Sequence, residues 1–468
     1  MARHPNLLLI ALDSLRADHM SLYGYRRLTT PHMDRFARGG VVFENAFSPH
    51  IPTTPGFAGM LTGRDCFGTG IVSLRDSRPI GPPTLAQVLS AEGYATSVIG
   101  FAEPPMIQGF EMWRDYAAWG SWAERPSRKA ELLAEVAVPE LRRLARCGRP
   151  FFLMLRYMDP HSPYLPPAPF DRMFYAGDEF DPASKSMQPV WAFKPFRDYF
   201  ATWMPPGLTD REYVIAQYDG AVAYMDACVG SMLAQVSALG LDEDTLVIMI
   251  ADHGETLDEH GCYFDHHGLY DCILRVPLIF RMPGQVPSGL RLPDGCLLQD
   301  VAPTVLDVLG VSAHVQFDGQ SLLPRMRGER RTPSAEFYTT ECTWMRKHGW
   351  RTPEWKLIHA LEPDFHFMPE AELYNLSDDP QENHNLVGEE PDVVALLERR
   401  MGAWIARRER ETGRPSPMLA DLRSYTSREK AGPFRSSQEA YDALRLNPVR
   451  PGCAVQTPLE RLRALGYA

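Results

Sequence analysis

Short apolar runs alternate with longer amphipathic segments through roughly the first 310 residues of the chain. Each run is short enough for one buried strand and is followed by polar residues. The runs are Asn6–Leu12, Ala95–Gly100, Phe151–Tyr157, Thr245–Ala251 and Val276–Arg281. Between them, Ser127–Arg146 and Thr209–Leu239 have the period of amphipathic helices. The alternation predicts an α/β fold in which a large, mostly parallel sheet is sandwiched by helices.

The same pattern predicts how the chain divides. We expect a catalytic α/β domain over residues 1–334 and a smaller C-terminal α+β subdomain over residues 335–410. The remainder, residues 411–468, is polar, Arg-rich and contains prolines, so we expect an arm that wraps either the body of the protein or a neighbouring subunit of a homo-oligomer.

Within the subdomain, Ala335–Thr340 and Lys356–Ala360 have the pattern of strands, and Glu390–Arg410 has that of an amphipathic helix. Two stretches in the first domain are rich in proline and aromatic residues, Phe110–Trp122 and Pro163–Pro206. They are predicted to be long loops, which either cover the functional site or pack on the surface.

Composition and charge narrow the classes of function. The 468-residue chain has a formal net charge of −11 and no long block of Lys or Arg, which argues against a nucleic-acid partner. The apolar run Leu7–Leu12 is too short to span a bilayer, so we expect no membrane partner and a cytoplasmic location. The eight cysteines occur singly, without a CxxC pair, which is typical of reduced structural residues.

Candidate metal ligands directly follow two of the predicted strands. Asp13 follows the first, and Asp252 with His253 follows the strand that ends at Ala251. The carboxyl ends of parallel strands meet at one edge of a sheet, where ligands gather. Two carboxylates with an imidazole suit Zn²⁺ or Mn²⁺, and Ca²⁺ less well. A single Asp at a strand end is more often a loop or capping residue, so the prediction depends on all three together.

Two hydroxyl groups precede a predicted helix. Thr53 and Thr54 lie just before Pro55, which suits the first turn of a helix. Free N–H groups and the helix dipole favour an anion at this position. Taken alone, however, a Thr before a helix is more often only a cap.

From residue 6 to residue 387 the chain resembles the sulfatase-like branch of the alkaline phosphatase superfamily. The matching segments, in chain order, are NLLLIALDSLRADHMSLYGY, TPHMDRFARGGVVFENAFS, the helix ending in LTGR, RYMDPHSPYLPP, IMIADHGETLDEHG, FDHHGLYDCILRVPLIFRMPG, QDVAPTVLDVLG and ELYNLSDDPQENHNLV. The resemblance implies an alkaline-phosphatase-like fold and a small-molecule ester as substrate. It also implies one metal site, whose ligands are Asp13, Thr53, Asp252 and His253.

The chain departs from the sulfatase pattern at the nucleophile. Family sulfatases carry Cys or Ser in a C/S-x-P-S-R motif and convert that residue to formylglycine. Thr53 stands at this position here, and Gly56 and Phe57 replace the Ser and Arg of the motif. We therefore expect no formylglycine, with Thr53 as the direct nucleophile and Thr54 as a substrate-binding neighbour. The implied reaction passes through a covalent phospho-threonine, with a metal ion lowering the pKa of the Thr53 hydroxyl.

Two further segments supply candidate substrate-site residues. The resemblance implies that two histidines protonate the leaving oxygen, His161 and His266. It implies three substrate-binding residues, Asp159, His267 and Arg16. Alternatively, Asp159, His161 and a third histidine bind a second metal, as in two-metal phosphatases. We favour one metal, because the spacing shows no third ligand.

The leading hypothesis is a metal-dependent hydrolase that cleaves phosphate or phosphonate esters, mono- or diesters, through Thr53. The alternatives are a sulfatase that hydrolyses sulfate esters and a phospho-group transferase, a class whose known members are usually membrane-anchored. A non-enzymatic homologue with a decayed site is a further alternative. Against it, the nucleophile and the metal ligands would be expected to disappear together, and here they all persist.

Overall fold

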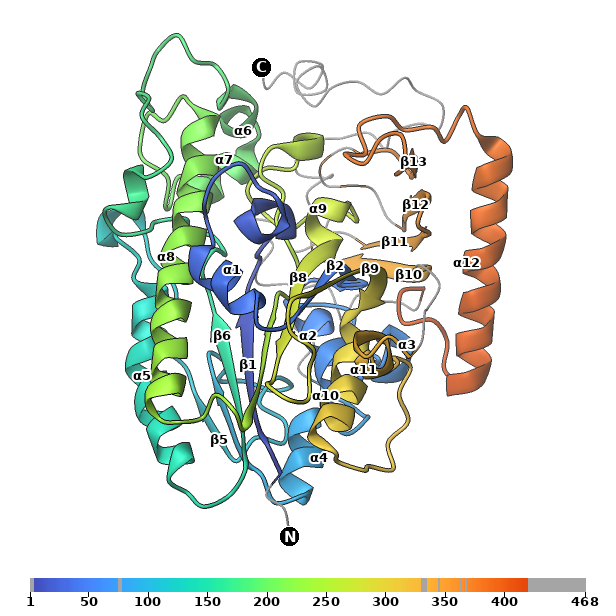
Figure 1. Ribbon diagram of the computed structural model, residues 1–468. Coiled ribbons are helices and arrows are strands. Elements are labelled where there is room, and N and C mark those ends of the chain that lie inside the picture. The colour runs from blue at the N-terminus through green and yellow to red at the C-terminus, as the bar shows by residue number, and fades with distance from the viewer. Residues whose placement is uncertain are drawn as a thin grey trace.

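The computed structural model describes residues 4–74, 78–329, 335–343, 346–361, 364, 366 and 368–419. Within them, an eight-stranded sheet has the order β5-β4-β6-β1-β7-β8-β2-β9 (Figure 1). Its strands are β1 (Asn6–Leu12), β2 (Val41–Phe47), β4 (Ala95–Ile99), β5 (Met112–Arg114), β6 (Phe151–Tyr157), β7 (Thr245–Ile250), β8 (Arg275–Arg281) and β9 (Leu290–Leu297). β8 is antiparallel to both of its neighbours, and the other neighbouring pairs are parallel. The predicted mostly parallel sheet is confirmed.

Helices cover both faces of this sheet. α5 (Lys129–Ala145) and α8 (Arg211–Ala238) lie on one side, and α2 (Thr53–Thr62), α4 (Leu85–Ala91) and α10 (Val301–Leu309) lie on the other (Figure 1). All seven residues of β1 and all six of β7 are buried. A strand that is buried on both faces needs an uninterrupted apolar sequence, which is why these strands stand out in the sequence.

The remaining helices are short, apart from one at the C-terminal end. The other α-helices are α1 (Pro31–Ala37), α3 (Cys66–Thr69), α6 (Gln188–Ala192), α7 (Lys194–Phe200), α9 (Asp271–Leu274), α11 (Leu323–Met326) and α12 (Pro391–Thr412). Short 3-10 turns cover Ala17–His19, Ser21–Tyr23, Trp122–Glu124, Phe170–Arg172, Glu259–Gly261 and Leu298–Asp300. Among the described residues, no helix is long and apolar enough to cross a membrane.

The two stretches that were predicted to be loops contain regular structure. Residues 110–122 include β5, which extends the sheet beyond β4, and residues 163–206 include α6 and α7. The prediction that they are loops throughout was wrong. Both short helices carry a proline at their first or second position, where its missing N–H and fixed φ suit a helix start. These two prolines therefore lie at the starts of helices, although the number of prolines in the sequence of this segment suggested a loop.

A second, smaller sheet has the order β13-β12-β11-β10-β3. Its strands are β3 (His50–Ile51), β10 (Phe337–Cys342), β11 (Arg346–Arg351), β12 (Trp355–Ala360) and β13 (Ala371–Asn375). The predicted α+β subdomain is thus confirmed, and α12 packs against β11 and β12. β3 comes from the N-terminal part of the chain and pairs in parallel with β10. The edge strand of the small sheet is therefore the segment that directly precedes α2. The predicted arm lies outside the described residues from residue 420 onward.

Candidate active site

Three parallel strands bring the candidate site residues to one edge of the large sheet. β1 lies between β6 and β7, and the registers Leu12↔Tyr157 and Ala11↔Ile250 align the ends of the three strands. The chain then continues into Asp13 after β1, and the Asp13 N–H donates to the Tyr157 carbonyl at 2.9 Å. The polar residues that follow the three strands therefore converge, as their positions in the sequence predict.

The nucleophile candidate lies at the first residue of α2. Thr53 is buried, and its Oγ1 lies 3.1 Å from His253 Nε2. α2 packs directly on the loop after β7, because a Cβ at Gly56 would lie only 3.0 Å from the Asp252 carbonyl oxygen. A side chain at position 56 would require the Asp252 carbonyl to shift by a few tenths of an ångström. This close approach explains why glycine suits the position where the sulfatase motif has Ser.

Asp13, Asp252 and His253 form a compact cluster of candidate ligands. One ligand atom from each lies within 4.8 Å of the others, and all three residues are buried. His253 Nδ1 lies 2.9 Å from the Gly254 carbonyl oxygen, so the ring proton is on Nδ1 and Nε2 is an acceptor. Asp252 Oδ2 lies 3.5 Å from this Nε2 and has no hydrogen-bond partner among the described residues. Asp252 Oδ2 and His253 Nε2 are thus two buried acceptors that face each other with no proton between them. A cation between them would satisfy both, so the residues fit a divalent metal.

Arg156 balances part of the charge of this cluster. Its guanidinium lies 2.5 Å from Asp13 Oδ2, at the carboxyl ends of β1 and β6. Burial opposes ionisation of Asp13, but the charge and the hydrogen bond of Arg156 hold its pKa well below the usual range. Burial and the neighbouring Asp13 instead raise the pKa of Asp252. Arg156 thus neutralises the charge of Asp13. Within the described part of the chain, the carboxylate of Asp252 has no such partner, which also favours a bound cation at this position.

Sequence reasoning missed Arg156, although the sequence carried a signal. It is the charged residue in the otherwise apolar strand FFLMLRY, and a charge inside a buried strand usually has a specific partner. Ser14 was also missed: its N–H donates to Asp252 Oδ1 at 3.3 Å and its hydroxyl donates to Asp13 Oδ1 at 3.1 Å. Ser14 has a positive φ of 60°, which lets both groups reach the cluster.

The loop after β6 presents His161 and is fixed by a buried lysine. Lys129 Nζ donates to the carbonyl of His161 at 2.6 Å and to that of Pro163 at 3.2 Å, and it lies 3.4 Å from Asp159. Asp159 also accepts the N–H of Ala130 at 3.1 Å, at the start of α5. These contacts account for Asp159 as a loop-fixing residue, and the prediction that it binds substrate gains no support from them. Nor do the described residues place it with His161 in a three-ligand cluster.

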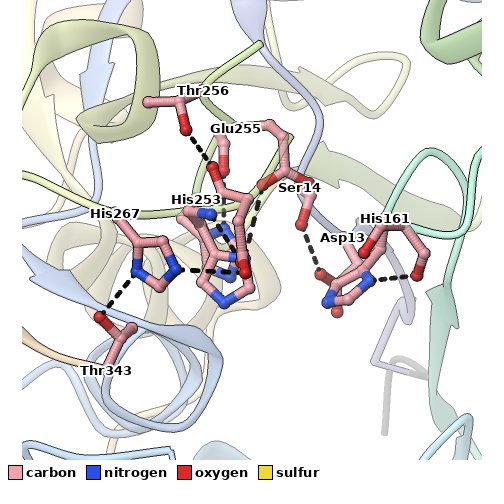
Figure 2. A network of polar contacts seen from close by, with 12 residues as sticks. Asp13, Ser14, His161, His253, Glu255, Thr256, His267 and Thr343 are labelled. Carbon is pink, nitrogen blue, oxygen red and sulfur yellow. Dashed lines mark hydrogen bonds and ion pairs between the residues drawn. The ribbon is translucent and has the colours of Figure 1, made fainter. Parts of the chain in front are cut away.

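His266 and His267 point to different parts of the molecule. The His266 ring lies beside the site, with its centroid 4.5 Å from that of His253 and 5.6 Å from that of His161. His267 instead contacts Thr343 of the small-sheet region, 3.1 Å from Nδ1 to Oγ1. Figure 2 shows His253 between His267 on one side and Asp13 with His161 on the other. The structure therefore gathers His161 and His266 around the site, while His267 connects it to the second sheet.

Two other predicted substrate ligands have partners elsewhere. The Arg16 guanidinium donates to Asp18 at 2.7 and 2.9 Å and to Glu259 at 2.6 Å. The Thr54 hydroxyl donates to the Leu74 carbonyl. The predicted roles of Arg16 and Thr54 in substrate binding therefore gain no support from their contacts, whereas Asp13, Thr53, Asp252 and His253 lie together as predicted.

The fold and the family profiles define the class. The α/β sandwich with a smaller C-terminal sheet is alkaline-phosphatase-like in fold. The sulfatase family profile matches residues 5–311, and the profile of the N-sulphoglucosamine sulphohydrolase C-terminal region matches residues 258–406. The chain belongs to the sulfatase family.

Individual relatives agree with this assignment. The chain is 25% identical over 489 residues to an N-acetylglucosamine-6-O-sulfatase of Bacteroides thetaiotaomicron, covering 85% of this chain and 86% of the relative. It is 26% identical over 460 residues to human arylsulfatase A, covering 85% and 87%. Among solved structures, the phosphonate monoester hydrolase of Agrobacterium radiobacter superposes with a TM-score of 0.71 at 21% identity, covering 86% of this chain and 96% of the other. That last likeness concerns the fold.

Proposed function

We propose that the protein is a metal-dependent hydrolase of sulfate monoesters, with Thr53 as its nucleophile. The observation that carries the proposal is the 3.1 Å contact between Thr53 Oγ1 and His253 Nε2, beside the cluster of Asp13, Asp252 and His253. The sequence alone ranked phosphorus esters first. Membership of the sulfatase family, with relatives named as sulfatases, supports the sulfate ester more strongly.

Thr53, Asp13, Asp252 and His253 would hold the divalent ion. Their donor set combines oxygen with one imidazole nitrogen, which favours Zn²⁺ or Mn²⁺ over Ca²⁺. When bound, the ion would supply a Lewis acid that lowers the pKa of the Thr53 hydroxyl and withdraws charge from the ester oxygens. Arg156 keeps Asp13 ionised and thus ready as a ligand.

The side chains divide the remaining work. The Thr53 hydroxyl loses its proton to solvent, and Oγ1 attacks sulfur in line with the leaving oxygen, so an Oγ1–S bond forms as the ester S–O bond breaks. The first N–H groups of α2, which have no intrahelical partners, stabilise charge on the other sulfate oxygens. A histidine at the site, His161 or His266, gives a proton to the leaving oxygen. Water then cleaves the Oγ1–S bond, returns a proton to Thr53 and releases sulfate.

A second candidate is the hydrolysis of phosphate or phosphonate esters by the same steps. The plain hydroxyl of Thr53 favours it. A formylglycine hydrate can expel its sulfate by re-forming a carbonyl, but a threonine ester must be cleaved by water at sulfur or phosphorus. Both candidates need the same nucleophile and the same metal ligands, so they differ in substrate and not in site.

A panel of 4-nitrophenyl esters distinguishes the candidates. The metal-loaded protein is assayed on a sulfate, a phosphate monoester, a phosphate diester and a phosphonate monoester, with Thr53→Ala as the reference for background. The sulfate is expected to give the highest kcat/KM, and Thr53→Ala to lose it. A phosphorus ester that is preferred by about tenfold or more establishes the second candidate instead. Absence of Thr53-dependent turnover of every ester, with metal bound, overturns both.

A further inference from the structure

Two carboxylates lie close to one nitrogen of the His266 ring. His266 Nδ1 lies 3.1 Å from Asp265 Oδ1 and 3.5 Å from Glu255 Oε1. All three residues are at most slightly exposed, and the ring lies against His253 of the candidate metal cluster. A carboxylate this close to Nδ1 favours a proton on that nitrogen by its charge, which leaves the chemistry to Nε2.

Asp265 is itself fixed from two more directions. The backbone N–H of His266 donates to Oδ1 at 2.8 Å, and His267 Nε2 lies 3.1 Å from Oδ2. Burial opposes ionisation, but the two histidines hold the pKa of Asp265 well below its usual range. Asp265 is therefore a rigidly held anion that faces His266.

His267 connects Asp265 to the second sheet, as Figure 2 shows for its contact with Thr343. Glu341 of β10 lies 3.7 Å from His267 Nδ1 and is fully buried. It accepts the N–H of Gly268 at 2.9 Å and the hydroxyl of Thr343 at 2.7 Å. Burial lowers the pKa of His267, but its two carboxylate neighbours raise it to about 9, so the ring is a cation at neutral pH. An alternating series of charges thus runs from the second sheet to His266.

We propose that Asp265 is a positioning residue that orients His266 for proton donation to the leaving oxygen, and that Glu341 holds Asp265 in place through His267. The inference rests on the proposed ester hydrolysis and assigns its acid to one of the two candidate histidines. In that step the Nε2–H bond of His266 breaks, an O–H bond forms on the leaving alcohol, and the bond from that oxygen to sulfur breaks. Solvent returns the proton before the next turnover.

If Asp265 positions His266, its substitution should change the dependence of the rate on the leaving group, which a general loss of structure would not do. A leaving group that is a weak base departs without a proton, whereas a strongly basic one needs general acid catalysis. Misplacing His266 therefore slows esters of basic alcohols far more than esters of acidic phenols. The dependence of kcat on the basicity of the leaving group reports the position of the acid.

The experiment measures kcat and KM on a series of aryl sulfates from phenyl to 2,4-dinitrophenyl. Asp265→Asn is expected to lower kcat on the phenyl ester about a hundredfold and on the dinitrophenyl ester less than about threefold, with KM nearly unchanged. His266→Gln is expected to show the same dependence. Glu341→Gln, one step further from the ring, is expected to show it at about a tenfold loss on the phenyl ester.

Glu372→Gln is the matched control. Glu372 is another buried carboxyl of the second sheet, but its contacts are Lys347, Tyr270 and Tyr374. Its loss is expected to lower the Tm while leaving the leaving-group dependence as in the wild type. The same steepening in Glu372→Gln as in Glu341→Gln would mean that any damage to the sheet produces it, and would overturn the specific route through His267.

Two further outcomes separate this inference from its alternatives. A loss of kcat in folded Asp265→Asn that is uniform across the series overturns the positioning role and leaves the proposed hydrolysis standing. A fall in bound metal per chain in Asp265→Asn also overturns it, because Glu255, Asp265 and His266 would then be metal ligands, for which their atoms are close enough. Absence of turnover by the wild type overturns the hydrolysis and this role together.

Discussion

Thr53 and Thr54 are neighbours in the sequence, but their hydroxyl groups have different partners. Thr53 Oγ1 lies 3.1 Å from His253 Nε2, whereas Thr54 donates its proton to the Leu74 carbonyl. A hydroxyl that is already bonded to a backbone oxygen is poorly placed to attack an ester. The contacts thus favour the nucleophile that the register of the sulfatase motif predicts, and a substitution at each position can separate the two.

Thr53→Ala is expected to reduce kcat on the preferred ester by about a thousandfold or more, because a methyl group can be neither nucleophile nor metal ligand. The Tm should change by no more than about 4 °C, since one hydroxyl contact is lost. Thr62→Ala is the matched control at the opposite end of the same buried helix, where its hydroxyl donates to the Ala58 carbonyl at 2.6 Å. Wild-type kcat in folded Thr53→Ala would remove this residue from the mechanism.

Metal content tests the ligand cluster independently of any substrate. Asp252→Asn and His253→Ala are each expected to lower the bound Zn²⁺ or Mn²⁺ per chain, because a three-residue cluster that loses one charged or imidazole ligand binds much more weakly. The measurement is elemental analysis after dialysis. Asp226→Asn is the control, since Asp226 is a buried carboxyl that accepts the N–H groups of His32 and Met33. Full occupancy in both ligand variants would place the metal elsewhere.

The sequence predicted which residues of the candidate site come together at the ends of strands. Asp13, Asp252 and His253 were recognisable because a parallel sheet brings strand ends together, whatever the intervening chain does. Arg156 and Asp265 were not predicted, since the value of a buried charge depends on a partner that is distant in the sequence or set by loop geometry. Arg156 pairs with Asp13 across 143 positions, which no local pattern reveals.

At the scale of elements, the start of α5 fixes the loop that carries His161. Lys129, the first residue of this helix, is almost fully buried and spans the carbonyl groups of His161 and Pro163. Burial lowers its pKa and raises that of its partner Asp159. The pair therefore stabilises one loop conformation at the cost of two buried charges, and removing one charge leaves the other uncompensated.

Lys129→Met is expected to lower the free energy of unfolding by about 3–5 kcal/mol, the usual effect of breaking a buried ion pair on one side. Asp159→Asn added to it should recover part of this loss, because the orphaned carboxylate becomes neutral. Urea unfolding of the two single variants and the double variant gives the coupling energy. A loss below about 1 kcal/mol in Lys129→Met would mean that the pair is not what fixes the loop.

The strands that are most completely buried were predicted best from the sequence. The limits of β1 and β6 were predicted to the residue, because each is a nearly continuous apolar run, interrupted by Asn6 at the start of β1 and by Arg156 near the end of β6. β5 was missed, since a three-residue edge strand with two exposed side chains has no pattern to detect. β3 was missed for another reason: its two residues become a strand through pairing with β10, almost 300 positions away in the sequence.

At the scale of the whole molecule, the two sheets share a core next to the site. Phe47 and Ile51 from the N-terminal part pack with Tyr270, Phe337 and Ile358 in one buried cluster. β3 leads directly into α2, whose first residue is Thr53. The small sheet thus supports the nucleophile helix through its pairing with β3, in addition to supplying Glu341.

A chain that ends at residue 329 is therefore expected to lose both stability and turnover. Truncation exposes the apolar side chains of the shared cluster, and each large side chain returned to water costs about 1.5–3 kcal/mol. Ile358→Ala separates the two effects: it should lower the free energy of unfolding by about 2–5 kcal/mol in urea but leave kcat nearly unchanged, since none of the candidate site residues belongs to its cluster. A truncated chain with wild-type Tm and kcat would show that the large sheet is sufficient by itself. If Ile358→Ala lost kcat in step with stability, the second sheet would act on the site through its packing as well as through Glu341.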